Sequence, residues 1–334
     1  MKSVKEVYAD LSELIKGIEA VVDKEYNNGL KSLFFIGNGG TYSYGMPIEF
    51  MAKRMTTFPI FNEQSAEITA CGHKFLGEGS LCIFESATGN TPDLNKAMAY
   101  TRSKGAHNLA IVYKKEEGNK EESPMKALAD YFFEVDHDIS KFAYYEPAFR
   151  VMNLHGDFAG YDKMWSQIAT AEMGEALENA GKIVRNRSVY FAARNHDPNN
   201  QIFLVGAGAT YGAAYCLGMC VLEEMQWMRT RIIHAGEFFH GCLELVVKDT
   251  PFIIIKGEDE DRALIERVEK FIAPLTNEVV VYDTKEIPLP IDDEFRPLIC
   301  SIVCDSIIYE LDKPMQDNTD HDLKKRRYYR YMNY

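Results

Sequence analysis

A carboxylate and an imidazole, Glu224 and His240, are the residues of this chain best suited to proton transfer. Glu224 closes an otherwise apolar helical run at 213–222, so removal from water is expected to make it a strong enough base for a carbon-bound proton. His240 can move protons on oxygen or nitrogen near neutral pH. Each residue alone also fits an ordinary role, as a glutamate at a solvent-facing helix end and as a histidine in a turn.

The sequence around both residues resembles the second sugar-isomerase (SIS) domain of fructosamine-6-phosphate deglycases. In that family Met-Glu-Met-Gln-Trp is followed by His-Ala-Gly-Glu-Tyr-Phe-His-Gly, and this chain differs there only at Glu223 and Phe238. The resemblance implies that Glu224 is the general base and His240 the general acid.

The C-terminal segment carries the one cluster of basic residues, Lys324-Lys325-Arg326-Arg327, interleaved with tyrosines. Such a cluster fits RNA binding, but a packed tail that closes over an anionic metabolite is the favoured interpretation. Arg326-Arg327-Tyr328 and the terminal Tyr334 resemble the Arg-Arg-Tyr…Tyr ending of the same family. We therefore expect Arg326, Arg327 and Tyr334 to contribute to the site.

The composition predicts a globular protein of about two domains. The chain has 334 residues, 46% of them hydrophobic, and no apolar run long enough to cross a bilayer. Its formal charge of −13 opposes a general nucleic-acid or membrane-surface role. The N-terminus has no secretory or transit pattern, and the seven cysteines lack any Cys-x-x-Cys, so we expect a cytoplasmic protein with reduced thiols.

An internal repeat sets the fold class. Ile36-Gly37-Asn38-Gly39-Gly40-Thr41-Tyr42 recurs as Val205-Gly206-Ala207-Gly208-Ala209-Thr210-Tyr211, each copy joining a strand-like run to an apolar helix. The pattern predicts an α/β protein of two tandem SIS domains, each a doubly wound parallel sheet flanked by helices. A dinucleotide-binding fold is disfavoured, because neither copy has the third spaced glycine and no Walker lysine follows.

The predicted organisation has five parts. They are an N-terminal helix at 1–30, a phosphate-binding SIS domain at 31–150, connecting helices at 151–195, a catalytic SIS domain at 196–312 and a tail at 313–334.

A hydroxyl-rich segment at 86–91 is the candidate phosphate site. It follows the strand-like run 81–84 and precedes a helix, so its hydroxyls and the helix-start amides should meet at the carboxyl end of the sheet. Simple helix capping is the alternative. The segment resembles the SIS phosphate loop Ser-x-Ser-Gly-x-Thr, which implies phosphate binding by Ser86, Ala87, Thr88, Gly89 and Thr91, with Gly39, Gly40 and Thr41 from the first loop.

The second copy of the repeat gives an internal comparison for this loop. After the run 252–255 it has Lys256-Gly257-Glu258-Asp259-Glu260-Asp261, whose carboxylates would repel a phosphate. We therefore expect phosphate binding in the first half and proton transfer in the second.

The resemblance implies a reaction on a fructose 6-phosphate that carries an amine on C1. Glu224 would move the proton from C1 to C2 through an enaminol, His240 would assist ring opening, and water would release glucose 6-phosphate and the amine. No metal or organic cofactor is required. Which amine leaves stays open, because the residues around the C1 substituent lie in loops that cannot be placed.

Two rival functions remain. A phosphosugar isomerase or aminosugar-phosphate deaminase related to glucosamine-6-phosphate synthase would use a lysine three residues before the base, where this chain has Val221. We also expect no glutaminase half, which would begin with a catalytic N-terminal cysteine, because Lys2 follows Met1. A non-catalytic phosphosugar sensor would need a helix-turn-helix or partner domain, and about thirty residues before the first strand are too few.

The resemblance also implies shared active sites, since in related SIS enzymes the histidine of the His-Ala-Gly-Glu segment reaches a neighbouring subunit. Phe238 and Phe239 beside His240 are the predicted apolar contact. We expect a homodimer or a higher even homo-oligomer.

Overall fold

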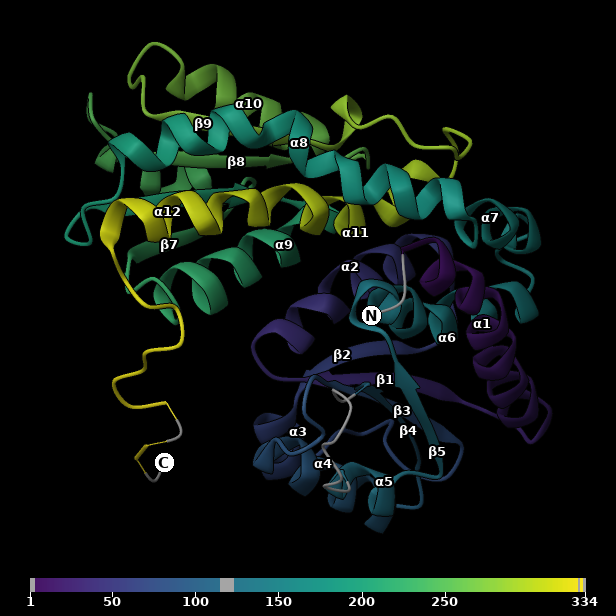
Figure 1. Ribbon diagram of the computed structural model, residues 1–334. Helices are drawn as coiled ribbons and strands as arrows, with labels where there is room; N and C mark the ends of the chain where they lie inside the picture. Colours follow the sequence, from purple (N-terminus) through teal and green to yellow (C-terminus); the bar gives the residue numbers. More distant parts are fainter. Residues whose placement is uncertain (1–3, 115–122, 330, 333–334) are drawn as a thin grey trace. The chain divides into compact units, whose positions relative to one another are not determined.

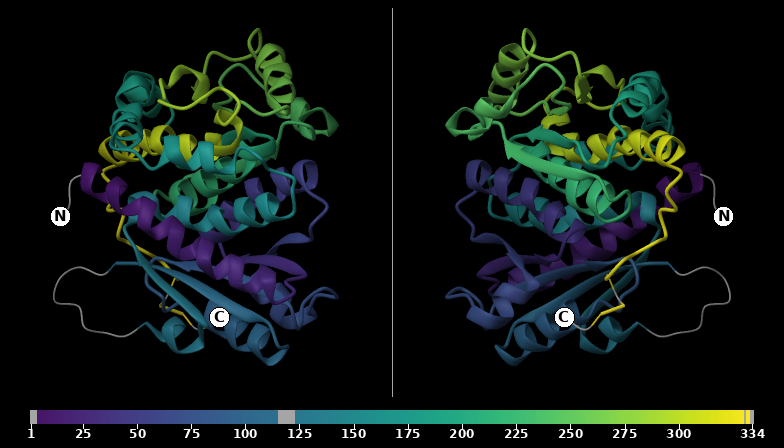
Figure 2. Two further views of the ribbon diagram at one scale, coloured as in Figure 1. Left: turned by 90° about the vertical axis from the view of Figure 1, so that its right-hand side faces the viewer. Right: turned by 90° about the vertical axis from the view of Figure 1, so that its left-hand side faces the viewer.

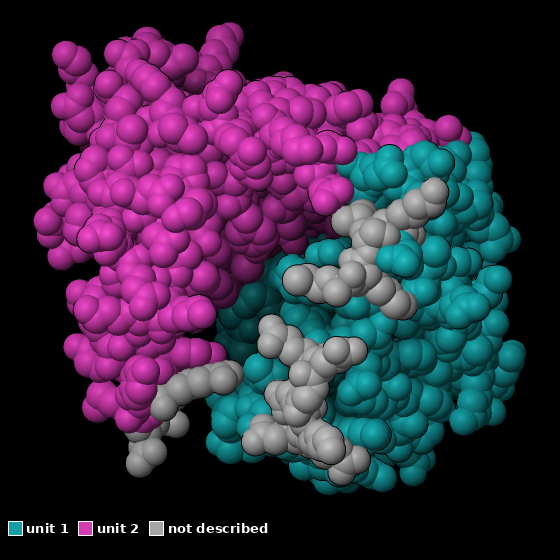
Figure 3. All heavy atoms as spheres, in the orientation of Figure 1, with its two compact units in different colours: residues 1–175 teal, residues 176–334 magenta. Residues whose placement is uncertain are grey.

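The computed structural model describes residues 4–114, 123–329, 331 and 332. The chain divides into two compact units, residues 1–175 and 176–334, coloured separately in Figure 3. The division falls inside a long helix, α8 (Ala171–Arg194). No helix among the described residues combines the length and the apolar character needed to span a bilayer.

The first unit is a five-stranded parallel sheet with the order β2-β1-β3-β4-β5. Its strands are β1 (Ser32–Gly37), β2 (Ile60–Gln64), β3 (Ser80–Ser86), β4 (His107–Tyr113) and β5 (Tyr131–Val135). Its helices are α1 (Val4–Asn27), α2 (Gly40–Met55), α3 (Ser65–Cys71), α4 (Pro92–Ser103), α5 (Pro124–Leu128), the 3₁₀ turn η1 (His137–Ile139), α6 (Ser140–Leu154) and α7 (Tyr161–Ile168).

Helices cover both faces of this sheet (Figures 1 and 2). Strand residues of one parity, Phe34, Cys82 and Phe84 among them, form a core with α3, α4 and α5. The opposite parity faces α1, α2 and α6, as the rings of Phe35 and Tyr144 show with centroids 5.1 Å apart. Both faces of β1 and β3 are therefore buried, which explains their continuous apolar runs.

The second unit repeats the arrangement with four parallel strands in the order β7-β6-β8-β9. The strands are β6 (Gln201–Gly206), β7 (Arg229–His234), β8 (Phe252–Lys256) and β9 (Val279–Asp283). The helical elements are η2 (Gly208–Thr210), α9 (Tyr211–Tyr215), the π-helix η3 (Cys216–Glu223), η4 (Phe238–His240), η5 (Cys242–Leu245), α10 (Arg262–Ile272), η6 (Thr284–Glu286), α11 (Arg296–Ile308), η7 (Tyr309–Leu311) and α12 (Asp312–Thr319). The predicted fold class is confirmed.

The repeated glycines have the same structural task in both units. A Cβ on Gly37 would lie 2.4 Å from the Tyr42 nitrogen, and one on Gly206 would lie 2.8 Å from the Thr210 oxygen. Gly39 and Gly208 have φ values of 53° and 54°, a backbone region that favours glycine. Both copies thus need glycine to turn the chain from a buried strand into a helix.

The prediction missed one strand in each unit, β2 and β7. Both are edge strands with the sequences Ile-Phe-Asn-Glu-Gln and Arg-Thr-Arg-Ile-Ile-His. β2 and β7 carry polar and charged residues, so they lack the continuous apolar run that marks the central strands.

Candidate active site

The two predicted phosphate-binding loops lie at one edge of the first sheet. β1 and β3 are parallel neighbours with Ile36 opposite Phe84, so the loops at 37–41 and 86–91 both leave their carboxyl ends. The first leads into α2 at Gly40 and the second into α4 at Pro92. Two helix N-termini, each with a partial positive charge, therefore begin at this edge.

The hydroxyls of the second loop accept hydrogen bonds from the loop itself. Ser86 Oγ accepts the Gly89 amide at 3.0 Å, and Thr88 Oγ1 accepts the Asn90 amide at 3.2 Å. The Thr91 hydroxyl lies 3.4 Å from that of Ser86. A hydroxyl that accepts from the backbone keeps its own proton to donate, so this loop can present O–H groups to an anion.

The first loop is closed by Thr41. Its Oγ1 accepts the Asn38 amide and donates to the Asn38 carbonyl, both at 3.1 Å. Gly39 and Gly40 beside it are partly exposed, and Ala87 and Thr88 across the edge are exposed. The structure thus brings together all eight residues predicted for the phosphate.

The equivalent edge of the second unit already holds an acceptor. Asp259, in the loop after β8, accepts the Ala209 amide through Oδ2 at 3.0 Å. Burial raises the pKa of Asp259, while hydrogen bonds from the Ala209 and Asp261 amides lower it. In the second unit the protein's own carboxyl thus accepts the Ala209 amide, whose counterpart in the repeat of the first unit is Gly40.

Glu224 directly follows the π-helix η3, in which the Glu224 amide bonds the Met219 carbonyl five residues back at 3.1 Å. Runs of π-helix are rare and often occur at functional sites. The side chain of Glu224 is 33% exposed and forms an ion pair, so the expected apolar surroundings are wrong. The apolar run before it is buried, but the helix ends at Glu223 and the carboxylate turns outward.

The partner of Glu224 comes from the C-terminal segment. Arg326 reaches Glu224 Oε1 with Nε at 3.1 Å and Nη2 at 3.0 Å. Arg327 stacks over the Trp227 ring at 4.0 Å. Two of the three predicted tail residues thus lie at the candidate base, and Tyr334 lies outside the described residues.

His240 is exposed and ends the short helix η4 after β7. The residue two places before it, Phe238, is fully buried and packs against Phe252 and Phe271 with ring centroids 6.1 and 5.9 Å away. Phe238 therefore anchors the segment in the core, and its prediction as exposed interface surface is wrong. Exposed apolar surface occurs slightly later, at Leu245 and Val247, which are 49% and 65% exposed.

The elements that lead to Glu224 and His240 pack on opposite faces of the second sheet. η3 packs on the face of Ile232, because a Cβ on Gly218 would lie 2.6 Å from Ile232 Cγ1. Ile233 points the other way, into the cluster that contains Phe238. No hydrogen bond or ion pair joins Glu224 to His240 in the described part of the chain.

A buried carboxyl beside the phosphate loop was not anticipated from the sequence. Glu85, the residue before Ser86, is fully buried on the α6 face of β3. Burial raises its pKa to about 7, against the smaller opposing effects of Ser140, Lys141 and Tyr113. The signal in the sequence is one glutamate inside a buried strand, where the second copy has Ile255.

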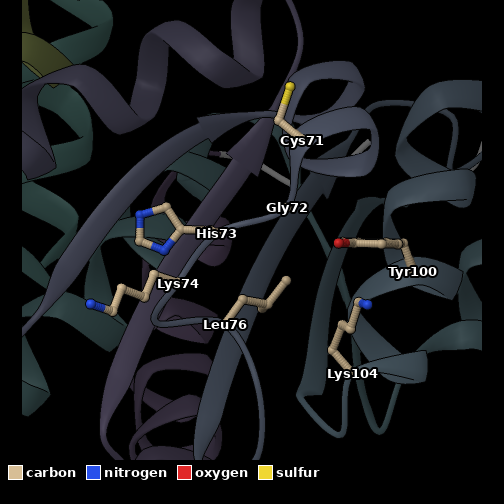
Figure 4. A pocket seen from close by; sticks show the side chains of 7 residues that line it. All are labelled: Cys71, Gly72, His73, Lys74, Leu76, Tyr100 and Lys104. Carbon is tan, nitrogen blue, oxygen red and sulfur yellow. The ribbon is translucent and has the colours of Figure 1, made fainter.

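A shallow hollow of about 330 Å³ in the first unit lies at the other ends of α3 and α4 (Figure 4). Its lining residues are Cys71, Gly72, His73, Lys74, Leu76, Tyr100 and Lys104. Because both helices end here, their carbonyls face the hollow's edge and oppose an anion. The hollow is separate from the phosphate loops.

The fold and its loops match those of a known class of proteins. No protein-family model matches the chain. Among solved structures, a protein from Bacillus subtilis described as a phosphosugar isomerase superposes with a TM-score of 0.88 at 26% identity, covering 97% of this chain and 100% of that one. The C-terminal domain of glucosamine-fructose-6-phosphate aminotransferase from Francisella tularensis shares the fold at a TM-score of 0.69 and 14% identity, over 94% and 96% of the two chains. The fold is that of the SIS phosphosugar isomerases.

Sequence similarity to particular enzymes gives a more specific comparison than the fold alone. The chain is 28% identical to fructosamine deglycase FrlB of Bacillus subtilis (strain 168) over 320 residues, which is 93% of this chain and 95% of the relative. It is 23% identical to fructoselysine 6-phosphate deglycase of Escherichia coli (strain K12) over 337 residues, which cover 98% of this chain and 93% of the relative. The resemblance inferred from the motifs is confirmed: the chain's relatives are deglycases and phosphosugar isomerases that it matches over nearly its full length.

Proposed function

We propose that this protein is a deglycase that hydrolyses a fructosamine 6-phosphate to glucose 6-phosphate and a free amine or amino acid. The observation that carries the proposal is the near full-length similarity to fructosamine and fructoselysine 6-phosphate deglycases. The open anion edge of the first unit and the partly exposed carboxylate of the second supply the two functions that this reaction needs.

In the proposed reaction the hydroxyls of Ser86, Thr88 and Thr91 and the start of α4 hold the phosphate. Glu224 removes a proton from C1 of the open-chain ketoamine, giving an enaminol, and returns it to C2, giving an imine between C1 and the nitrogen. His240 moves protons on oxygen during ring opening. Water then adds to the imine carbon, and the C1–N bond breaks to leave the aldehyde of glucose 6-phosphate and the amine.

We further propose a homodimer, or a higher even assembly, with shared active sites. The proposal is supported by the packing of η3, which ends just before Glu224, on one face of the second sheet, whereas Phe238, two residues before His240, packs on the other face. Leu245 and Val247 supply exposed apolar surface a few residues after His240. In a shared site, Glu224 of one copy and His240 of another would act on the same substrate.

The test is product formation by the purified protein with fructoselysine, glucoselysine and fructose-aspartate 6-phosphates, coupled to glucose-6-phosphate dehydrogenase. Release of glucose 6-phosphate together with free amine from at least one of them supports the proposal. Interconversion of glucose 6-phosphate and fructose 6-phosphate without amine release would favour the phosphosugar isomerase instead. Phosphosugar binding with neither reaction would favour a sensor.

A further inference from the structure

The C-terminal segment, residues 312–327, packs against the turn at 224–227 that carries the candidate base. Gln226, a buried residue in that turn, donates through Nε2 to the Asp312 carbonyl at the start of α12, at 2.9 Å. Eight residues beyond α12's first residue the chain leaves the helix, and His321 then stacks on Trp227 with ring centroids 4.4 Å apart. Contacts at both ends thus hold the segment against residues 224–227.

Trp227 shows that this turn is held in an unusual conformation. Its φ is 56°, in the left-handed region that a bulky side chain rarely adopts. Such a residue keeps its conformation only where its surroundings enforce it, and these outliers concentrate at functional sites. Here the surroundings are His321 on the ring, Arg327 at 4.0 Å and Lys325 at 5.6 Å from its centre.

The guanidinium of Arg326 is fixed before it meets Glu224. Nη1 donates to the backbone carbonyls of Leu323 and Lys325, at 2.5 and 3.1 Å, within its own turn. The remaining edge, Nε and Nη2, points at Glu224 Oε1. The Arg326 side chain is 19% exposed, so most of its surface is in contact with protein.

We propose that Arg326 is a positioning residue for Glu224, holding one carboxylate oxygen so that the other faces the substrate carbon. The inference rests on the proposed function, in which Glu224 is the base. A glutamate at a helix end has several rotatable bonds, whereas proton transfer from carbon needs a fixed approach. Both contacts fall on Oε1, and Oε2 accepts no hydrogen bond within the described residues.

A role in stability alone does not account for this contact. Partly exposed ion pairs contribute little to folding, and the segment is held independently through Gln226 and Trp227. Loss of Arg326 should therefore leave the segment docked while the carboxylate loses its fixed orientation. A segment that stays docked while activity falls would distinguish a positioning role of Arg326 from a structural one.

The experiment compares Arg326→Gln with Arg326→Lys and with Lys324→Gln. Lys324 is an exposed residue on the same segment, so its replacement removes the same charge without touching Glu224. We expect Arg326→Gln to lower kcat for glucose 6-phosphate release about 10- to 100-fold with KM changed by less than about threefold. Arg326→Lys should recover part of kcat, and Lys324→Gln should match the wild type.

Docking is measured in the same proteins through tryptophan emission. The chain has two tryptophans, so a Trp165→Phe background leaves Trp227 as the reporter. We expect Arg326→Gln to keep the Trp227 emission of the parent, whereas truncation before residue 320 should change it. A kcat for Arg326→Gln equal to that of Lys324→Gln would overturn the inference, as would a Trp227 signal equal to that of the truncated chain. A wild type that releases no glucose 6-phosphate would instead refute the proposed function on which the inference rests.

Discussion

Replacement of Glu85 by glutamine should change how the stability of the first unit depends on pH. Glu85 is fully buried, and burial raises its pKa from 4.5 to about 7. Below pH 4.5 the carboxyl is protonated in both the folded and the unfolded chain, so it does not change the slope of the free energy of unfolding against pH. As pH rises, the unfolded chain releases the proton first, and stability falls until the folded group also ionises above about pH 7.

The size of the effect follows from the two pKa values. At about 1.36 kcal/mol per pH unit, the interval from 4.5 to about 7 corresponds to about 3 kcal/mol. The free energy of unfolding of the wild type, minus that of Glu85→Gln, should therefore decrease by about 3 kcal/mol between pH 4.5 and pH 8. The variant lacks this decrease because its amide does not ionise.

Urea titrations at a series of pH values measure this difference. In a Trp227→Phe background Trp165 is the one remaining tryptophan, and it is buried in the first unit. Glu134→Gln, which removes an exposed carboxyl from β5, is the matched control and should keep the wild-type profile. Parallel profiles for the wild type and Glu85→Gln would refute the assignment of a neutral buried carboxyl beside the phosphate loop.

The remaining predictions concern catalysis and assembly. Glu224→Gln should lower glucose 6-phosphate release by several orders of magnitude while phosphosugar binding, followed by calorimetry, stays within about threefold of the wild type; substantial turnover would remove Glu224 from the mechanism. Mixing inactive Glu224→Gln and His240→Ala subunits should restore activity after subunit exchange, and a mixture that exchanges but stays inactive would place both residues in one chain's site. Ser86→Ala and Thr88→Val should each raise KM roughly 10-fold with kcat little changed, because their hydroxyls hold a group that does not react; equal rates on phosphorylated and unphosphorylated fructosamine would contradict the phosphate loop. Val247→Asp should weaken self-association in sedimentation velocity, and an unchanged oligomer would exclude this surface from the interface.

Much of the fold follows from the sequence because central parallel strands are buried on both faces. The runs that became β1, β3, β6 and β8 are continuously apolar, and the glycines at 37 and 206 mark where each first strand turns into a helix. β2 and β7 have no such signal, because polar and charged residues interrupt their apolar positions.

The position of the hydroxyl loop before a helix followed from the sequence, whereas the contacts of Glu224 did not. Residues 86–91 carry a local pattern of hydroxyls before a helix, and in the structure these hydroxyls lie together in the loop before α4. The surroundings of Glu224 depend on Arg326, 102 residues further along the chain, and on a π-helix that the apolar run 213–222 does not distinguish from an α-helix. Likewise, the burial of Phe238 depends on Phe252 and Phe271, which no local pattern connects to it.

The proposed function is tested most directly by the fate of fructoselysine 6-phosphate incubated with the wild-type protein and with Glu224→Gln. We expect the wild type to release glucose 6-phosphate and lysine in equal amounts and to turn over unphosphorylated fructoselysine poorly. The variant should release neither product at a comparable rate. A wild-type protein that leaves fructoselysine, glucoselysine and fructose-aspartate 6-phosphates unchanged, or a Glu224→Gln variant as fast as the wild type, would contradict the proposed function.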